Sequence, residues 1–222
     1  MRCASSASRI GRAAPLREVL GSNLEELQRV ASIVHDILFL SQADRGAIAR
    51  RVPTTSLAAL ALQVCNYHEA ALEDAGLALE IVGDASGSFD TPLLQRALSN
   101  LVGNATRYAQ RGSTVRVEIL QSAPGKVQLR VVNRGTAIEP SHLPRLFDRF
   151  YRGDPSRSHA DRNHGLGLDI VAAIARMHGG RPLATSADGI SSIGMSLKDG
   201  SAEHELSVQA TPSAALRVMP RP

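Results

Sequence analysis

The sequence is poor in the residue types that build disulfide frameworks, aromatic surfaces and membrane spans. Its 222 residues include two cysteines, no tryptophan, four phenylalanines and three tyrosines. Cys3 and Cys65 alone cannot form a disulfide framework or a four-ligand zinc site, so a reducing compartment is expected. No apolar run approaches the roughly 20 residues that a membrane helix needs, and residues 1–15 hold no apolar signal core. We therefore expect a cytoplasmic domain with a folded core and no membrane segment in these residues.

Lysine is equally scarce, because Lys126 and Lys198 are the only two, and arginine supplies nearly all of the positive charge behind the net +4. The arginines are spread along the chain between acidic residues, and few aromatic side chains are present to stack on bases. This pattern argues against a nucleic-acid partner. It is compatible with an anionic small ligand.

Residues 16–46 predict one long helix that ends at Gly46. Apolar residues recur along it at spacings of four and three: Leu20, Leu24, Leu27, Ala31, Val34 and Leu38. A single helix cannot bury such a seam, so a partner helix is implied. Residues 1–15 and 198–222 show no such periodicity and are expected to be disordered, and residues 47–55 are expected to be a linker.

Residues 56–197 alternate between helical and strand patterns. Ser56 can cap a helix that runs to Asp74, and Thr91 can cap a second helix to Ala109, with Pro92 in its first turn. Further helices are expected near 143–147 and at 166–177. Alternating apolar residues predict strands at 77–82, 115–120, 126–132, 183–186 and 191–197, the second and third of them joined as an antiparallel hairpin.

Three clusters in this region point to its chemistry. They read RALSNLVGNATRY (96–108), VVNRGTAI (131–138), and LFDRFYR followed by HGLGL (146–168). In this order they resemble the N box, the first glycine box, and the F box with the second glycine box of sensor histidine kinases. That family shares its ATP-binding fold with gyrase, Hsp90 and MutL, and its heavy-metal sensor subgroup has an F box similar to this one.

The helix before these clusters resembles the second helix of the kinase dimerisation hairpin, so the resemblance covers about residues 16–197. It implies an α+β fold in which a two-layer α/β sandwich of the Bergerat type, a mixed sheet covered by helices, follows one long coiled-coil-type helix. The domains implied are half of a dimerisation hairpin at 16–46 and an ATP-binding catalytic domain at 56–197.

The N box places Asn100 and Asn104 four residues apart, on one helix face. Asparagine is a poor helix-interior residue, so the pair asks for a reason beyond the helix. In the family the second asparagine coordinates the Mg²⁺ that bridges the ATP phosphates, which implies this role for Asn104. The resemblance also implies that Arg107 pairs with phosphate and that Tyr108 flanks the adenine. Taken alone, the same residues would read as surface polar groups.

The first glycine box supplies Asn133, Gly135 and Ile138. Most relatives have an aspartate at the position of Asn133, where it accepts a hydrogen bond from the adenine amino group. An amide oxygen can accept the same bond without the charge. Ala137 replaces the second glycine of the box. In isolation this sequence is also compatible with an ordinary loop after a strand.

The second glycine box, Gly165-Leu166-Gly167-Leu168, precedes a helix. Its glycines would let backbone amides approach phosphate, and the helix N-terminus favours an anion there. Asn163 stands where the family has a further glycine, and His164 replaces a small residue. In the F box, the resemblance implies that Arg149 and Arg152 meet phosphate, whereas Phe147 and Phe150 are expected to be core anchors.

None of the seven histidines stands in the His-Glu/Asp-Leu-Arg-Thr-Pro context that the family phosphorylates, and His35 is expected to be a solvated helix position. The resemblance therefore implies a kinase domain that transfers the γ-phosphoryl group of ATP, with Mg²⁺, to a histidine not present in this chain. The alternative is a truncated, catalytically silent module that binds ATP or dimerises. A gyrase-type ATPase is disfavoured, because residues 91–108 contain no acid to activate water.

The partners implied are ATP, a second copy or another chain along the long helix, and the receiver domain of a response regulator. Full-length relatives are inner-membrane proteins that carry this domain on the cytoplasmic side, so a cytoplasmic location is expected.

Overall fold

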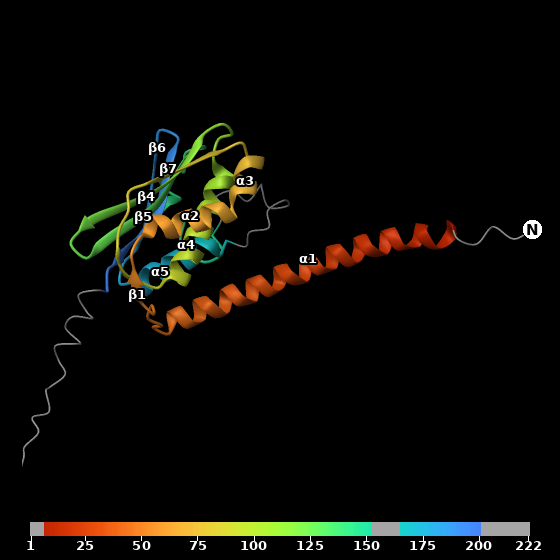
Figure 1. Cartoon of the computed structure of the whole chain (residues 1–222), viewed down its shortest axis with the longest axis horizontal. Helices are drawn as coiled ribbons and strands as arrows, with labels where there is room; N and C mark the ends of the chain where they lie inside the picture. Colours follow the sequence, from red (N-terminus) through yellow and green to blue (C-terminus); the bar gives the residue numbers. More distant parts are fainter. Residues whose placement is uncertain (1–6, 152–164, 201–222) are drawn as a thin grey trace, which may run out of the picture.

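The computed structural model describes residues 7–151 and 165–200, which form a two-layer domain and one long helix (Figure 1). Helix α1 (Ala7–Asp44) reaches the domain with its C-terminal turns, and its N-terminal part extends far beyond it. The helix begins at Ala7, so residues 7–15, which were expected to be disordered, are helical. The alanines and arginines of this segment favour a helix, whereas Gly11 and Pro15 do not, and no apolar repeat accompanies it. Gly46 follows with a φ of +83°, the left-handed conformation that commonly ends helices.

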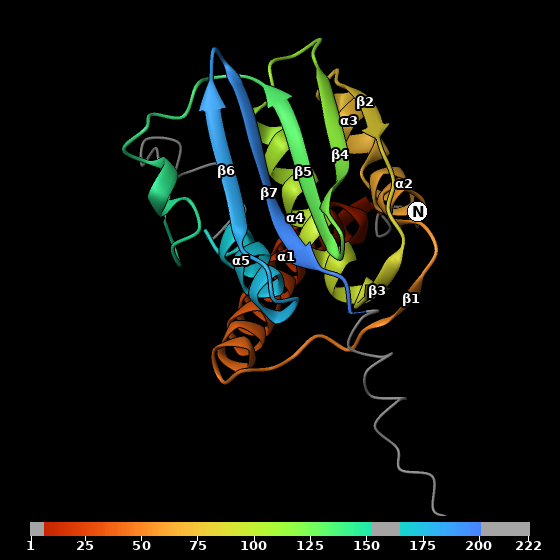
Figure 2. The same cartoon turned by 90° about the vertical axis from the view of Figure 1, so that its left-hand side faces the viewer.

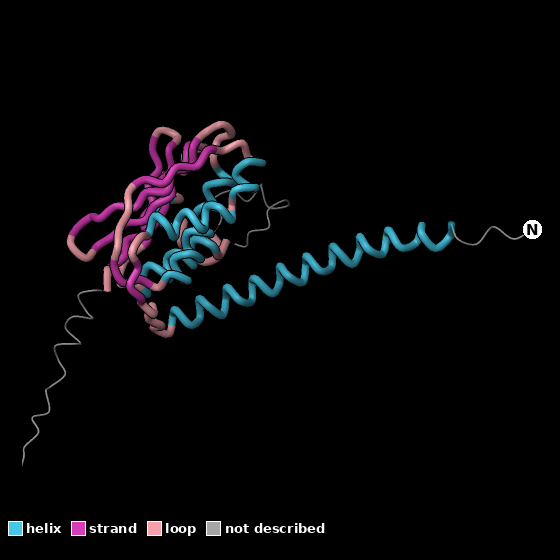
Figure 3. The backbone as a smooth tube through the Cα atoms, in the orientation of Figure 1, coloured by secondary structure: helices cyan, strands magenta, loops and turns pink. Residues whose placement is uncertain are grey.

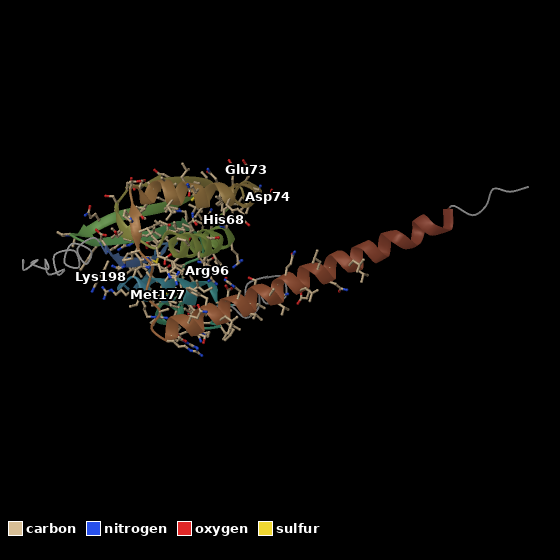
Figure 4. The ribbon with its side chains drawn as sticks, turned by 60° about the horizontal axis from the view of Figure 1, so that its bottom comes forward. His68, Glu73, Asp74, Arg96, Met177 and Lys198 are labelled. Atoms are coloured by element: carbon tan, nitrogen blue, oxygen red, sulfur yellow. The ribbon has the colours of Figure 1, made fainter. Side chains whose placement is uncertain are left out.

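The C-terminal turns of α1 pack against α5 and α4. Leu40 is fully buried there, and Phe39 lies under the guanidinium of Arg96, 4.2 Å from ring centroid to Cζ. Arg96 also donates a hydrogen bond of 2.5 Å to the Asp36 carboxylate. Figure 4 shows Arg96 on the side of the domain that faces α1.

The predicted apolar seam of α1 is solvent-exposed in the part of the chain that the structure describes. Its large members are between 50% and 68% exposed: Leu20, Leu24, Leu27, Val34 and Leu38. None of the other described residues covers this row of apolar side chains.

A five-stranded mixed sheet forms one layer of the domain (Figure 2). Its strand order is β2 (Ala78–Val82), β4 (Thr114–Ala123), β5 (Lys126–Arg134), β7 (Ile190–Lys198) and β6 (Pro182–Ala187). The β2–β4 pair is parallel, and the other neighbours are antiparallel. The predicted hairpin is present as β4 and β5, with Gly125 in the turn at a φ of +68°.

Helices form the second layer, on one face of the sheet (Figures 2 and 3). They are α2 (Leu57–Tyr67), α3 (Glu69–Asp74), α4 (Thr91–Tyr108) and α5 (Gly167–Met177). Alternate residues of the central strands point into the core, so Val115, Val117 and Ile119 of β4 are buried against this layer. The predicted α+β two-layer architecture is confirmed.

Two predicted helix boundaries were wrong. The helix expected from Ser56 to Asp74 is divided at His68 into α2 and α3, and Ser56 caps the first of them by accepting a bond from Ala59 N at 3.0 Å. The cap of α4 is Asp90 rather than Thr91, because the Asp90 carboxylate accepts from Leu93 N at 3.2 Å and Thr91 is the first helical residue.

Two short strands and one turn of 3₁₀ helix complete the described residues. Strand β1 (Val52–Thr54) pairs with β3 (Gly87–Phe89), so the segment expected to be a plain linker contributes a strand to the domain. The 3₁₀ turn η1 (Leu143–Arg145) replaces the short helix expected at 143–147. Strand β7 includes Lys198, which was assigned to the disordered tail, and residues 201–222 lie outside the described residues. Among the described helices, none combines the length and apolarity of a membrane span.

Candidate functional site

A cavity of about 840 Å³ opens between the helical layer and the ends of two sheet strands. Its lining comes from the C-terminal half of α4, the segment 135–151, the start of α5, and the core-facing side of β5 and β7. Ten of the predicted site residues line it: Asn100, Asn104, Arg107, Tyr108, Asn133, Gly135, Ile138, Gly165, Gly167 and Leu168. Three clusters that are far apart in the sequence therefore meet at one place.

The two asparagines of α4 differ in their bonding. Asn100 Nδ2 donates to Arg96 O in its own helix at 3.1 Å, and Asn100 Oδ1 lies 3.0 Å from the place that a Cβ on Gly167 would take. Asn100 thus holds the start of α5 close to α4. Asn104 lines the cavity, and its side chain makes no hydrogen bond to the described residues. Its amide oxygen is therefore available to a ligand.

The floor of the cavity is formed where β5 and β7 end. Asn133 faces Ser191 across the strand pair, and both side chains are 5% exposed. The Ser191 hydroxyl bonds to the Ser186 hydroxyl at 3.1 Å, and Ser186 Oγ accepts from Ile138 N at 3.0 Å. Asn133 makes no side-chain hydrogen bond within the described part of the chain. The floor therefore offers one amide that has no hydrogen-bond partner among the described residues.

Gly135 ties the glycine-box segment to the end of α4. Gly135 N donates to Gly189 O at 2.8 Å, and Gly135 forms an isolated bridge with Ala109. A Cβ at Gly135 would lie 2.1 Å from Tyr108 O, so no other residue fits without a backbone shift. This close approach explains the glycine and places Tyr108 at the rim of the cavity.

The start of α5 follows Gly165, which has a φ of +71° and accepts a bond from Phe150 N at 3.1 Å. A Cβ there would lie 2.9 Å from the Phe150 backbone. No side chain caps α5, so the N–H groups of its first turn remain without a side-chain acceptor. Leu166 is 2% exposed and belongs to the core, so its predicted place in the site is limited to the backbone.

Arg149 does not line the cavity. Its Nε donates to Asp169 Oδ2 on α5 at 2.9 Å, and its Nη2 donates to Asp44 Oδ2 on α1 at 3.2 Å. These bonds raise the pKa of Arg149 above its usual value and neutralise Asp169, which is 6% exposed in the first turn of α5. Arg149 thereby links α1 to the start of α5, and Arg152 lies outside the described residues.

Other side chains of the segment 135–151 also line the cavity. His142 bonds to the Tyr151 hydroxyl, and Arg145 lies over the Tyr151 ring, 4.4 Å from its centroid. Phe147 packs against the core as expected, but Phe150 is 57% exposed with a φ of +62°, so it is not a core anchor. The sequence analysis missed His142, Tyr151, Ser186 and Ser191, because isolated serines in a strand and single aromatic or histidine residues in a loop carry no pattern.

Other kinds of chemistry find little support among the described residues. Burial raises the pKa of the Cys65 thiol to about 11, so this cysteine stays protonated at neutral pH and is an inert core residue. No group of three histidine, cysteine or acidic side chains gathers in the part of the chain that is described. The cavity thus combines amide groups, an arginine and backbone N–H donors, a set that suits a polyanionic ligand with a hard cation.

Residues 89–201 match the protein family described as histidine kinase-, DNA gyrase B-, and HSP90-like ATPases. The sensor histidine kinase CusS of Escherichia coli (strain K12) is 47% identical over 172 residues, which are 77% of this chain and 36% of that protein. The sensor protein CopS of Pseudomonas syringae pv. tomato is 42% identical over 140 residues, 63% of this chain and 28% of that one. The chain therefore spans about a third of the length of these relatives. The predicted resemblance to sensor histidine kinases of the heavy-metal subgroup is confirmed.

Two solved structures share the fold. The Acinetobacter baumannii histidine kinase AdeS superposes with a TM-score of 0.68 at 20% identity, covering 81% of this chain and 83% of that chain. Full-length ShkA in complex with AMPPNP gives a TM-score of 0.68 at 22% identity, covering 88% of this chain and 40% of that one.

Proposed function

Because this chain belongs to the family of histidine kinase-, DNA gyrase B- and HSP90-like ATPases, as an ATP-binding catalytic domain of the sensor histidine kinase kind, we propose that its cavity binds ATP with Mg²⁺ and that the bound ATP is the phosphoryl donor to a histidine outside these residues. One observation carries the proposal. Within residues 7–151 and 165–200, the Asn104 and Asn133 amides make no side-chain hydrogen bond and no side chain caps α5, and all three features line the same cavity. A nucleoside triphosphate would meet Asn104 and the start of α5 with its phosphates, and it would meet Asn133 with its base.

The residues present fit a magnesium ion. Mg²⁺ prefers oxygen ligands and is usually held by one or two protein groups together with phosphates and water. The Asn104 amide supplies one such oxygen, whereas the Asn100 amide is bonded to its own helix. When bound, Mg²⁺ would neutralise charge on the phosphate oxygens.

The chain's own residues would divide the remaining work by position. Backbone N–H groups of Gly167 and Leu168 at the start of α5, together with Arg107, would hold the phosphates. Asn133, Ile138 and Tyr108 would hold the base. Arg149 would act on the site through Asp169, because reaching a phosphate would require breaking its two ion pairs. Catalysis would then consist of positioning and charge neutralisation, with no covalent step on these residues.

The proposal includes two protein partners. The exposed seam of α1 would pair with the same seam of a second copy, because apolar residues spaced by four and three match a coiled-coil interface. The receiver domain of a response regulator would take the phosphoryl group from the acceptor histidine. The proposal also places these residues in the cytoplasm, as the resemblance to sensor histidine kinases implies for the catalytic domain.

A transfer assay tests the proposal. The purified chain is mixed with a complete dimerisation hairpin that contains the acceptor histidine, and γ-labelled ATP with Mg²⁺ is added. Label on the hairpin is expected. Nucleotide binding without label on the hairpin would support the catalytically silent module and contradict the transfer step.

A further inference from the structure

Asn133 lies on the floor of the cavity, and its side-chain amide makes no hydrogen bond to the described residues. The residue is 5% exposed. Its amide atoms line the cavity and are not occluded from it, so they are accessible to whatever the cavity contains. Its neighbour Ser191 is equally buried but is satisfied through Ser186. A ligand in the cavity can therefore hydrogen-bond to the Asn133 amide without displacing a bond to any described residue.

An amide and a carboxylate differ in the hydrogen bonds that they can make to the edge of a purine base. It presents a donor and an acceptor side by side, and a half-turn of the side chain exchanges them. The edge of a 6-aminopurine offers an amino donor beside the N1 acceptor. The edge of a 6-oxopurine offers a carbonyl acceptor beside an N1–H donor. An amide can pair with either edge through two bonds. A carboxylate can only accept, from the 6-amino group of one base or from N1–H of the other, and beside N1–H its charge also repels the 6-oxo oxygen.

The rest of the floor does not select between the two edges. Ile138 and Ile193 are apolar, and the Ser191 hydroxyl is held by Ser186. The one carboxylate among the described lining residues is Glu139, which is exposed on the segment after β5 and does not belong to the floor. Selection at C6 of the base therefore depends on Asn133.

We propose that Asn133 makes the cavity accept 6-oxopurine nucleoside triphosphates alongside ATP. This inference rests on the proposed function, since it requires that the cavity binds a nucleotide through its base. Inosine triphosphate is the cleanest probe, because it differs from ATP only in the groups at C6 and N1 of the base.

Competition titration tests this directly. ATP and inosine triphosphate, each with Mg²⁺, displace a fluorescent ATP analogue from the wild-type protein. We expect the two dissociation constants to agree within about tenfold, since both edges make the same number of bonds. In Asn133→Asp, inosine triphosphate should lose at least about tenfold relative to ATP, because the carboxylate faces the 6-oxo group without a donor.

A matched control is Asn66→Asp, the same change at an exposed position of α2, which should leave the ratio of the two constants unchanged. Wild-type protein that binds ATP but binds inosine triphosphate more than about a hundredfold more weakly would overturn the inference and leave the proposed function intact. A ratio that Asn133→Asp does not change would also overturn it. Failure of both nucleotides to bind wild-type protein would end both proposals. The wild-type ratio needs no variant, so it decides the case even if Asn133→Asp does not fold.

Discussion

Asn100 and Asn104 are one helical turn apart, but only Asn104 is free to bind a ligand through its side chain within the described residues. Asn104→Ala should therefore weaken Mg²⁺–ATP binding by about tenfold or more, the loss expected for one ion-directed contact. The melting temperature of the nucleotide-free protein should change little, because the Asn104 side chain makes no hydrogen bond to the described residues. Both quantities are measured on the same preparation, with Asn66→Ala on the surface of α2 as the control. A destabilised variant with normal nucleotide affinity would contradict the metal-ligand role.

The burial of His178 is expected to make the free energy of unfolding depend on pH. Its ring is fully buried, with Nδ1 donating to Ile174 O at 2.8 Å and Nε2 accepting from Asp90 N at 3.1 Å. Burial, and to a smaller extent Arg51, lowers the pKa of His178 below its ordinary 6.5. The unfolded state therefore binds a proton more readily than the folded state once the pH falls below 6.5.

The free energy of unfolding should accordingly decrease as the pH falls from 6.5 toward the folded-state pKa of His178. Chemical denaturation between pH 8 and pH 5 measures this slope. His178→Gln should be less stable at every pH but should show a shallower slope. A residual slope is expected from His68, whose pKa burial also lowers. An identical slope in the variant would show that His178 is not the group responsible.

At the residue scale, the sequence placed ten of its predicted site residues on the cavity because the boxes carry them at fixed spacings along helices and strands. The F-box resemblance assigned Arg149 to phosphate, and no sequence pattern reveals its ion pair with Asp44, which lies 105 positions earlier in the chain. Phe150 was assigned to the core from its hydrophobicity, but its backbone, at a φ of +62°, leaves the ring exposed. Tertiary contacts decided both cases.

At the scale of elements, two adjacent residues at the start of α4, Asp90 and Thr91, are of types that commonly cap helices. Asp90 accepts from Leu93 N and, at 2.7 Å, from Arg50 N of the segment after α1. Asp90→Ala should lower the free energy of unfolding by about 2 kcal/mol, the upper end for loss of an N-cap, because it also leaves the Arg50 N–H without its acceptor. Thr91→Ala, which was the cap expected from sequence, should cost well under half of that. Equal losses in urea denaturation would contradict the assignment of the cap to Asp90.

The elements that the sequence predicted are those with a long periodic pattern, such as the β4–β5 hairpin and α5. The short strands β1 and β3 were missed because three residues are too few to show a period, and their pairing joins positions such as Val52 and Phe89. The break between α2 and α3 at His68 was missed because the apolar positions continue across it. There His68 Nε2 bonds to the Ser99 hydroxyl of α4 at 2.8 Å, a contact that sequence cannot show.

At the scale of the whole molecule, the seam of α1 predicts self-association. Leu24 and Leu27 are more than half exposed and do not belong to the core cluster of the described residues. The double variant Leu24→Glu/Leu27→Glu should convert a dimer into a monomer, because it places like charges opposite each other in the seam. Sedimentation equilibrium measures the mass, and the melting temperature of the domain should not change.

Leu62→Glu is the matched control, since Leu62 is 51% exposed on α2, away from the seam. It should leave the dimer intact. A wild-type protein that is monomeric at high concentration, or a double variant that remains dimeric, would contradict pairing through this seam.

Calorimetric titration of the purified chain with ATP, in the presence and absence of Mg²⁺, tests the central claim most directly. The account predicts saturable binding of one ATP per chain that strengthens when Mg²⁺ is present, since the phosphate charge beside Asn104 and the start of α5 is then neutralised. No saturable binding of ATP in the presence of Mg²⁺ would contradict it.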